Sequence, residues 1–323
     1  MPVLEVSNLH KRFNMEAGFF ARFGRFVNAV NDISFTINEN ETYGLVGESG
    51  CGKTTTARLL VRMYQADGGS IRYYPNEAPL DVMSLSKEKL RAYRQKVRYV
   101  FQDPARSLNP RMSVYDVLVS GLRWSGIEAG RAKKAQFREM AQAALLEVGL
   151  SPDDLERRPS EFSGGQRQRI SIARGLLMQP RLLICDEVVS ALDVSIQGQV
   201  LNLLLDIREK RDISFLFIAH DLKVACYFCD RIGVMYRGRL MEEACAADLW
   251  KDGLHPYTQL LFSSVKKGAQ AAPAIDIKKK NATPDSGCGF ADRCPLAKEA
   301  CFRENPPLRR VAPSHLLRCH RDF

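Results

Sequence analysis

The chain of 323 residues is 45% apolar and 26% charged, which is typical of a soluble globular protein with one large domain and a smaller one. The sequence contains no uninterrupted run of about 18 apolar residues, the length needed to span a membrane. Its N-terminal residues lack the basic flank and apolar core of a signal peptide. We therefore expect a cytoplasmic protein. The net charge of +10 favours anionic surfaces, but the lysines and arginines are scattered without a basic, aromatic-rich helix, so nucleic acid is not an expected partner.

The first predicted elements are short strands. Three β-rich runs occupy residues 3–9, 31–37 and 42–46. An aromatic and basic segment within residues 15–28 interrupts them. We interpret this segment as a hairpin extension packed on the neighbouring strands, and contact with lipid or a partner is the alternative.

Strands and helices then alternate along the chain. The predicted strands lie at residues 70–74, 97–101, 181–185 and 214–219, and the predicted helices follow residue 54, begin at Lys87, cover residues 114–148 and follow the last two strands. This alternation predicts an α/β fold in which helices cover both faces of a mostly parallel sheet. Ligand chemistry is then expected at the carboxyl ends of the strands.

The C-terminal part of the sequence differs in composition from the rest. We expect one domain over residues 1–265, a linker rich in Lys, Ala and Pro at 266–287, and a small tail at 288–323. Four of the nine cysteines lie in this tail. Cytoplasmic thiols are kept reduced, so a disulfide framework does not explain their clustering.

Residues 47–54 fit the phosphate-loop pattern G-x-x-x-x-G-K-[ST], between an apolar run and a helix start. Glycines allow successive backbone N–H groups to face a polyphosphate, the following helix presents its positive end, and Lys53 adds a charge. Thr54 supplies a hydroxyl for Mg²⁺. The candidate phosphate ligands are Gly47, Glu48, Ser49, Gly50, Cys51, Gly52, Lys53, Thr54 and Thr55.

Two carboxylates, Asp186 and Glu187, end the apolar run 182–185. One carboxylate at such a position can hold the Mg²⁺ shell, and the second can orient and deprotonate an attacking water while the metal and Lys53 neutralise the γ-phosphate. Acidic residues after a strand are common, and the upstream phosphate loop is what makes this pair informative. We assign Asp186 to Mg²⁺ and Glu187 to the catalytic base.

A third motif, Ser163-Gly164-Gly165-Gln166, resembles the signature motif of ABC-type ATPases. The resemblance covers about residues 3–263 and implies an ABC-type P-loop nucleotide-binding domain that binds ATP and Mg²⁺. Such a domain has a mostly parallel sheet core, an antiparallel β subdomain and a helical subdomain at about 103–160. The resemblance also implies that Phe13 stacks on adenine, that Gln102 is the Q-loop glutamine at Mg²⁺, that Asp193 ends the D-loop, and that His220 is the switch histidine at the γ-phosphate.

The Ser-Gly-Gly turn is a second anion site, because it opens a helix. A second site is useful if two domains pair head to tail, so that each ATP lies between residues 47–54 of one domain and residues 163–165 of the other. The sequence departs slightly from the family: Phe162 stands where Leu is commoner, and Val188 where Pro is frequent. Neither change removes a catalytic group, so we expect ATP hydrolysis.

Residues 101–112 and 255–261 resemble the ATPases of dipeptide and oligopeptide importers in particular. This resemblance implies a peripheral subunit at the cytoplasmic face of the inner membrane. Its implied partners are a paralogous ATPase in a heterodimer, two permease subunits and an extracytoplasmic solute-binding protein. The alternatives are import of another solute, such as an opine or a metal chelate, and a non-transport ABC protein that acts on nucleic acid.

The tail cysteines have the spacing C-x5-C-x6-C-x17-C and are Cys288, Cys294, Cys301 and Cys319. This pattern is similar to the C-terminal region of peptide importer ATPases, where the resemblance implies a [4Fe–4S] cluster. Four thiolates also suit tetrahedral Zn²⁺, although the spacings are wider than the C-x2-C pairs usual in zinc sites. Four unligated thiols are the third alternative. Cys226 and Cys229 are interpreted as small buried hydrophobes, and Cys51 as a side chain facing the fold.

Overall fold

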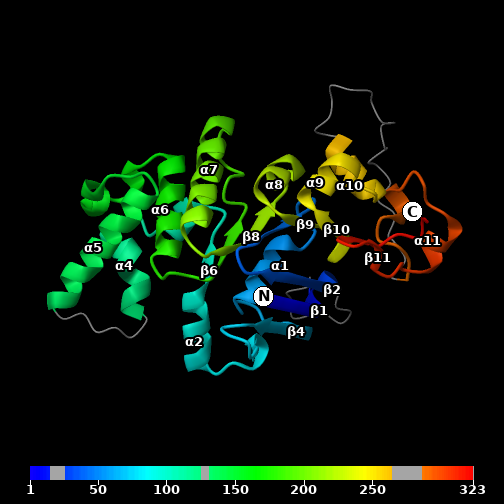
Figure 1. Cartoon of the computed structure of the whole chain (residues 1–323), viewed down its shortest axis with the longest axis horizontal. Helices are drawn as coiled ribbons and strands as arrows, with labels where there is room; N and C mark the ends of the chain where they lie inside the picture. The colour runs from blue at the N-terminus through cyan, green and yellow to red at the C-terminus, as the bar shows by residue number, and fades with distance from the viewer. Residues whose placement is uncertain (15–25, 125–130, 264–285, 323) are drawn as a thin grey trace, which may run out of the picture. The chain divides into compact units, whose positions relative to one another are not determined.

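The computed structural model describes residues 1–14, 26–124, 131–263 and 286–322 (Figure 1). The chain divides into two compact units: unit 1 comprises residues 1–4, 37–41 and 72–218, and unit 2 comprises residues 5–36, 42–71 and 219–323. The segment predicted as a hairpin extension lies outside the described residues over 15–25, and the predicted linker (266–287) lies outside them over 266–285. Within the described ranges, no helix has the length and apolar character needed to cross a membrane.

Unit 1 contains three parallel strands in the order β8-β7-β6. Their bounds are Val97–Val100 for β6, Leu182–Asp186 for β7 and Ser214–Ala219 for β8. All five residues of β7 are buried, as expected for a continuous apolar run in a parallel strand with both faces covered. The predictions of strands at residues 97–101, 181–185 and 214–219 are therefore confirmed.

Helices make up most of the remainder of unit 1. They are α2 (Lys87–Lys96), α3 (Pro104–Ser107), α4 (Val114–Trp124), α5 (Arg131–Glu147), α6 (Gly164–Leu176) and α7 (Val194–Lys210), with 3₁₀ turns η1 (Val82–Ser84), η2 (Pro152–Glu156) and η3 (Pro159–Glu161). In α4, Val114, Val117, Leu118 and Leu122 recur at three- and four-residue steps and are all buried. This face packs against α5 and α6, and the three helices lie together in Figure 1.

Five strands of unit 2 pair in the order β11-β12-β10-β9-β3. They are β3 (Thr42–Val46), β9 (Arg231–Tyr236), β10 (Arg239–Cys245), β11 (Arg309–Ala312) and β12 (His315–Leu317). The β3–β9 pair is parallel, and the β9–β10, β10–β12 and β11–β12 pairs are antiparallel. The helices are α1 (Lys53–Leu60), α8 (Leu222–Phe228), α9 (Ala246–Asp252), α10 (Pro256–Ser263) and α11 (Glu299–Arg303), with the 3₁₀ turn η4 (Ala291–Arg293).

A second sheet has the order β2-β1-β4-β5. Its strands are β1 (Pro2–Asn14), β2 (Phe26–Asn38), β4 (Gly68–Tyr73) and β5 (Leu80–Asp81), and most residues of the first three belong to unit 2. The strands predicted at residues 3–9 and 31–37 fall within β1 and β2. The strand predicted at 70–74 falls within β4 except for residue 74, which lies just beyond its end.

The C-terminal segment is fastened to unit 2 by a buried acid on β10. Glu242 is fully buried and accepts hydrogen bonds from the backbone N–H groups of Leu254 (2.7 Å) and His255 (2.9 Å). The Nε2 atom of His315, on β12, lies 2.7 Å from the same carboxylate. A buried carboxylate is stable only when such partners surround it. Glu242 therefore ties the residues before α10 and the last strand to one point of the sheet.

Candidate nucleotide-binding site

The phosphate loop of unit 2 runs from the end of β3 to the start of α1. Two of its glycines are required by the close approach of other backbone segments. A Cβ atom on Gly47 would lie 2.1 Å from the carbonyl oxygen of Met235, and one on Gly52 would lie 2.0 Å from that of Ala29. Gly52 is also the N-cap of α1 with φ 110°, a conformation that favours glycine. The loop is thus shaped by β9 and β2 as well as by its own sequence.

Lys53 folds back over this loop. Its side chain is buried, and its Nζ atom donates hydrogen bonds to the carbonyl oxygens of Gly47 (2.7 Å) and Glu48 (3.1 Å). The Cys51 side chain is buried, and burial raises the pKa of its thiol. Cys51 therefore faces the fold, as predicted. Its carbonyl oxygen accepts a hydrogen bond of 2.8 Å from Gly238, in the β9–β10 turn.

Ser49 and Gly50, at the loop's tip, are exposed, and Thr54 and Thr55 in the first turn of α1 are half-buried. Two further predicted residues lie elsewhere in unit 2. Phe13, on β1, is half-buried and packs edge-to-face on Tyr64 with ring centroids 5.4 Å apart. His220 is exposed directly after β8. Adenine stacking by Phe13 and γ-phosphate contact by His220 remain predictions.

Unit 1 brings two predicted catalytic residues together. The Nε2 atom of Gln102, which follows β6, donates a hydrogen bond of 2.8 Å to the Oε2 atom of Glu187, which follows β7. The contact follows from the parallel register, in which Val100 lies opposite Cys185, because the carboxyl ends of neighbouring parallel strands meet at one edge. The Gln102 side chain and the candidate base thus form one hydrogen-bonded pair.

The backbone of Glu187 adopts a rare conformation with φ 49°. For a residue with a Cβ atom this costs about 1–2 kcal/mol. Hydrogen bonds to both of its main-chain polar groups hold this conformation. The Glu187 N–H donates to the carbonyl oxygen of Ile218 (3.0 Å). The Glu187 carbonyl oxygen accepts from the N–H (3.1 Å) and from the hydroxyl (2.8 Å) of Ser190. Such locally held strain is a common property of functional sites.

Asp186 is the more deeply buried of the two acids, with 2% of its surface exposed. The hydroxyl of Tyr99, on β6, donates a hydrogen bond of 2.5 Å to its Oδ2 atom. The sequence analysis did not single out Tyr99. Its position three residues before Gln102, on the strand next to β7, is the signal that could have identified it.

The signature motif lies at the start of α6. Ser163 is its N-cap and forms a capping box with Gln166: the Ser163 N–H donates to Gln166 Oε1 (2.9 Å), and the Gln166 N–H donates to Ser163 Oγ (3.3 Å). Gly165 allows close packing on α7, because a Cβ atom there would lie 2.5 Å from Cγ2 of Ile196. Ser163, Gly164 and Gln166 are exposed. The motif therefore presents a helix N-terminus to solvent.

Asp193 is the N-cap of α7, beside this motif. Its carboxylate accepts a hydrogen bond of 3.0 Å from the N–H of Ile196. This bond is the main reason that the pKa of Asp193 is below its ordinary value, and a second bond from the Ser195 hydroxyl adds to it. Asp193 thus has a local structural role at the N-terminus of a helix.

The four tail cysteines line one cavity of unit 2, together with His255 and with Pro256 at the start of α10. Burial raises the pKa of the Cys288 thiol to about 11, and it also raises the pKa of the Cys294 thiol. The cavity has a volume of about 20 Å³, which is room for about one water molecule. Across the described residues no three Cys, His, Asp or Glu side chains are arranged to hold a metal ion. Four thiols suit a metal or a cluster chemically, but the segment would have to open to admit a cluster.

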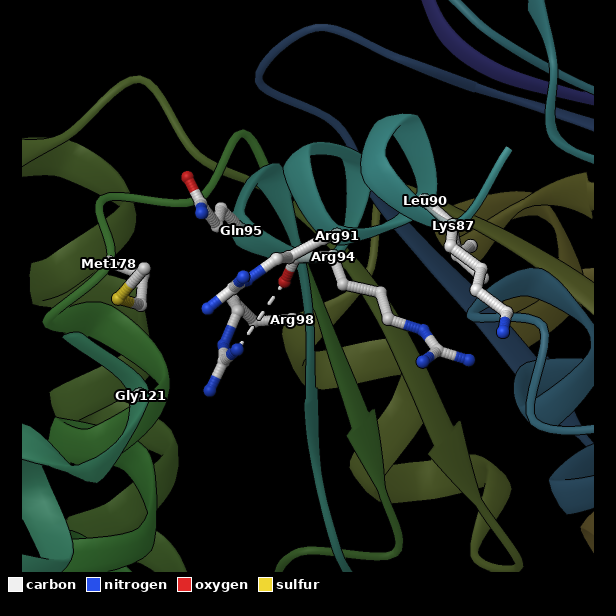
Figure 2. A pocket seen from close by; sticks show the side chains of 8 residues that line it. All are labelled: Lys87, Leu90, Arg91, Arg94, Gln95, Arg98, Gly121 and Met178. Carbon is white, nitrogen blue, oxygen red and sulfur yellow. Dashed lines mark hydrogen bonds between the residues drawn. The ribbon is translucent and has the colours of Figure 1, made fainter. Parts of the chain in front are cut away.

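Unit 1 also contains a basic cavity of about 400 Å³ that the sequence did not reveal (Figure 2). Its lining residues are Lys87, Leu90, Arg91, Arg94, Gln95, Arg98, Gly121 and Met178. None of them carries a carboxylate. Figure 2 shows Arg91 pointing across the cavity toward Met178. The buried Nε atom of Arg98 has no hydrogen-bond partner among the described residues, and burial lowers the pKa of this guanidinium.

In unit 1 the parallel strands deliver Gln102 and Glu187 to one edge, and the signature turn opens α6. Solved structures of ATP-binding cassettes share the fold of most of the chain. The dimeric cassette MJ0796 bound to ADP and Pi matches 75% of this chain and 98% of its own with a TM-score of 0.64 and 23% identity. The cbiO1 protein of Clostridium perfringens matches 78% of this chain and 91% of its own, with a TM-score of 0.64 and 24% identity.

Residues 30–190 match the ABC transporter family, and residues 241–301 match the C-terminal region of oligopeptide/dipeptide transporters. The oligopeptide transport ATP-binding protein AppF of Bacillus subtilis is 42% identical over 98% of this chain and 97% of its own. A putative peptide import ATP-binding protein of Brucella ovis is 41% identical over 99% of this chain and 98% of its own. The chain belongs to the ATP-binding subunits of oligopeptide and dipeptide ABC transporters, and so to the ABC ATPases.

Proposed function

We propose that this chain is the ATP-hydrolysing subunit that powers peptide import in a multi-subunit ABC transporter at the cytoplasmic face of the membrane. The observation that carries the proposal is the near-complete match, at 42% identity, to an oligopeptide transport ATP-binding protein. The test is reconstitution with the permease and solute-binding subunits, followed by measurement of ATP-dependent peptide uptake. Uptake of an opine or a metal chelate, but of no peptide, would favour the alternative cargo.

Catalysis is proposed to use the side chains of Lys53, Gln102 and Glu187. Lys53 and the backbone N–H groups of residues 47–54 bind the phosphates, and Glu187 accepts the proton of the attacking water while Gln102 orients its carboxylate. Oxygen ligands suit Mg²⁺, and Thr54, Gln102 and Asp186 are the residues that would hold it. When bound, Mg²⁺ would neutralise phosphate charge.

The exposed signature turn supports pairing with a second ATPase. A helix N-terminus such as that of α6 attracts an anion through its free N–H groups and its dipole. We propose that Ser163, Gly164 and Gly165 close over the triphosphate held by a paralogous ATPase, in a heterodimer that pairs head to tail.

The basic cavity is proposed to receive an acidic side chain of a permease subunit. Four of its eight lining residues are cationic, so an acidic partner would supply charge complementarity. It lies between α2 and the helical part of unit 1, next to the strand that leads to Gln102.

This docking predicts a charge-sensitive contact. Arg91→Glu is expected to reduce co-purification with the permease at least about fivefold, because one like charge in such an interface costs on the order of a kcal/mol or more. The ATPase activity of the subunit alone should not change. Lys89→Glu is the matched control, because Lys89 is exposed on the same helix and does not line the cavity. Equal co-purification of the two variants would exclude this docking site.

We further propose that residues 288–323 form a cysteine-rich extension whose four thiolates bind a [4Fe–4S] cluster, with Zn²⁺ as the alternative. The convergence of the four cysteines on one cavity supports the proposal. A segment of this size gains much of its order from such a group.

Protein purified without oxygen is expected to be brown, with absorption in the blue part of the visible spectrum and with iron and acid-labile sulfide. Cys301→Ser should abolish the visible absorption and the iron and sulfide content. Cys226→Ser, a change on α8, should leave both the absorption and the metal content intact. Zinc in place of iron would select the alternative, and the absence of all metal would refute both.

A further inference from the structure

The cysteine-bearing segment contacts the phosphate loop directly, through one ion pair. Arg293 lies in η4, between Cys288 and Cys294. Its Nη1 and Nη2 atoms donate hydrogen bonds of 2.9 and 2.8 Å to the two carboxylate oxygens of Glu48. Two parallel bonds of this kind fix geometry as well as charge. Glu48 is the second residue of the phosphate loop.

Neighbouring aromatic contacts hold both partners of this pair. The Arg293 guanidinium lies 5.6 Å from the ring centroids of Tyr236 and of Phe290, and a third bond of 3.3 Å runs to the Tyr236 hydroxyl. The hydroxyl of Tyr257, on α10, accepts a hydrogen bond of 2.9 Å from the Glu48 N–H. In Figure 1 the orange and red C-terminal segment lies beside α10, as these contacts require.

The pair differs from an ordinary surface salt bridge in its burial. Only 16% of the Arg293 side chain is exposed, and 40% of the Glu48 side chain. Exposed pairs contribute little because water screens them, and this pair is partly withdrawn from water. The bonds to Glu48 also raise the pKa of Arg293 above its ordinary value, so the guanidinium stays charged.

The charge of Glu48 matters because of where it lies. A carboxylate in a loop that binds a polyphosphate repels the ligand, unless a cation neutralises it. Arg293 supplies that cation from a segment 245 residues further along the chain. It also fixes the direction of the Glu48 side chain, and with it the first turn of the loop.

We propose that Arg293 is a positioning residue for the phosphate loop, and that the cysteine-bearing segment sets the loop's affinity for a nucleotide through the Arg293–Glu48 pair. The inference rests on nucleotide binding by residues 47–54, proposed above. It assigns to this segment a role at the nucleotide site that is independent of which metal, if any, the cysteines bind.

The test is a titration of the purified full-length chain with a fluorescent ATP analogue. Arg293→Gln is expected to raise the Kd about three- to tenfold, because Glu48 is left as an unneutralised acid in the loop. Glu48→Gln is expected to bind within about twofold of wild type. In the Glu48→Gln background, Arg293→Gln should have less than about a twofold effect, because the acid it neutralised is gone.

Arg303→Gln is the matched control. Arg303 pairs with Glu299 within α11 of the same segment, but both side chains are more than 70% exposed, so no effect on Kd is expected. The proposal would be overturned if Arg293→Gln left the Kd unchanged. It would also be overturned if Arg293→Gln raised the Kd as much in the Glu48→Gln background as in wild type. If wild-type protein itself fails to bind the analogue, the proposed function fails instead.

Discussion

Replacement of Glu187 by glutamine is expected to lower steady-state ATP turnover at least about 100-fold while ATP affinity stays within about twofold of wild type. A positioned general base contributes about 10²–10⁴-fold to a rate, and the amide cannot accept the proton. The substitution keeps the side-chain shape, and its amide oxygen can still accept the 2.8 Å hydrogen bond from Gln102. The strained backbone at this position is held by main-chain bonds that the change does not touch.

Phosphate release by the assembled transporter and equilibrium binding of ATP together measure this effect. Lys53→Ala serves as the contrast, because it is expected to weaken nucleotide binding itself. Full turnover in Glu187→Gln would remove Glu187 as the base. A parallel loss of ATP affinity would instead give Glu187 a role in binding.

The parts of the site that the sequence predicted are those encoded locally. The phosphate loop, the acids after β7 and the Ser-Gly-Gly turn each occupy consecutive residues. The Gln102–Glu187 contact joins residues far apart, but parallel pairing of β6 with β7 is enough to bring them together. Topology therefore supplies what the local pattern does not.

The parts that the sequence did not predict depend on side chains from distant elements. Tyr99 bonds Asp186, Tyr257 bonds the Glu48 backbone, and Arg293 bonds the Glu48 carboxylate. No periodicity marks these three residues. Tyr257 lies within the importer-like segment 255–261, but that resemblance did not predict its contact with Glu48. The spacing of the tail cysteines did indicate that they gather, but it could not give the size of the cavity that they line.

The second large effect is expected at the signature turn, for Gly164→Asp. A Cβ atom on Gly164 would contact only the Leu192 side chain, at 3.9 Å, so the fold has room for the substitution. An acid in the first turn of α6 is favourable by about 0.3–1 kcal/mol through the helix dipole. The variant should therefore fold at least as well as wild type and should bind ATP normally at its own phosphate loop.

The same carboxylate would lie where we propose that the partner's triphosphate is received. Two unit charges about 4 Å apart repel by about 4 kcal/mol near a protein surface, which corresponds to several hundredfold in an equilibrium constant. ATP-driven pairing with the partner ATPase should therefore weaken at least about 100-fold, and the ATP held by the partner should no longer be hydrolysed. Gly198→Asp on α7 is the control, because nothing lies within 4 Å of a Cβ there. Sedimentation of the two ATPases with excess ATP measures the pairing, and if Gly164→Asp sediments as a dimer like the control, head-to-tail closure over the nucleotide is wrong.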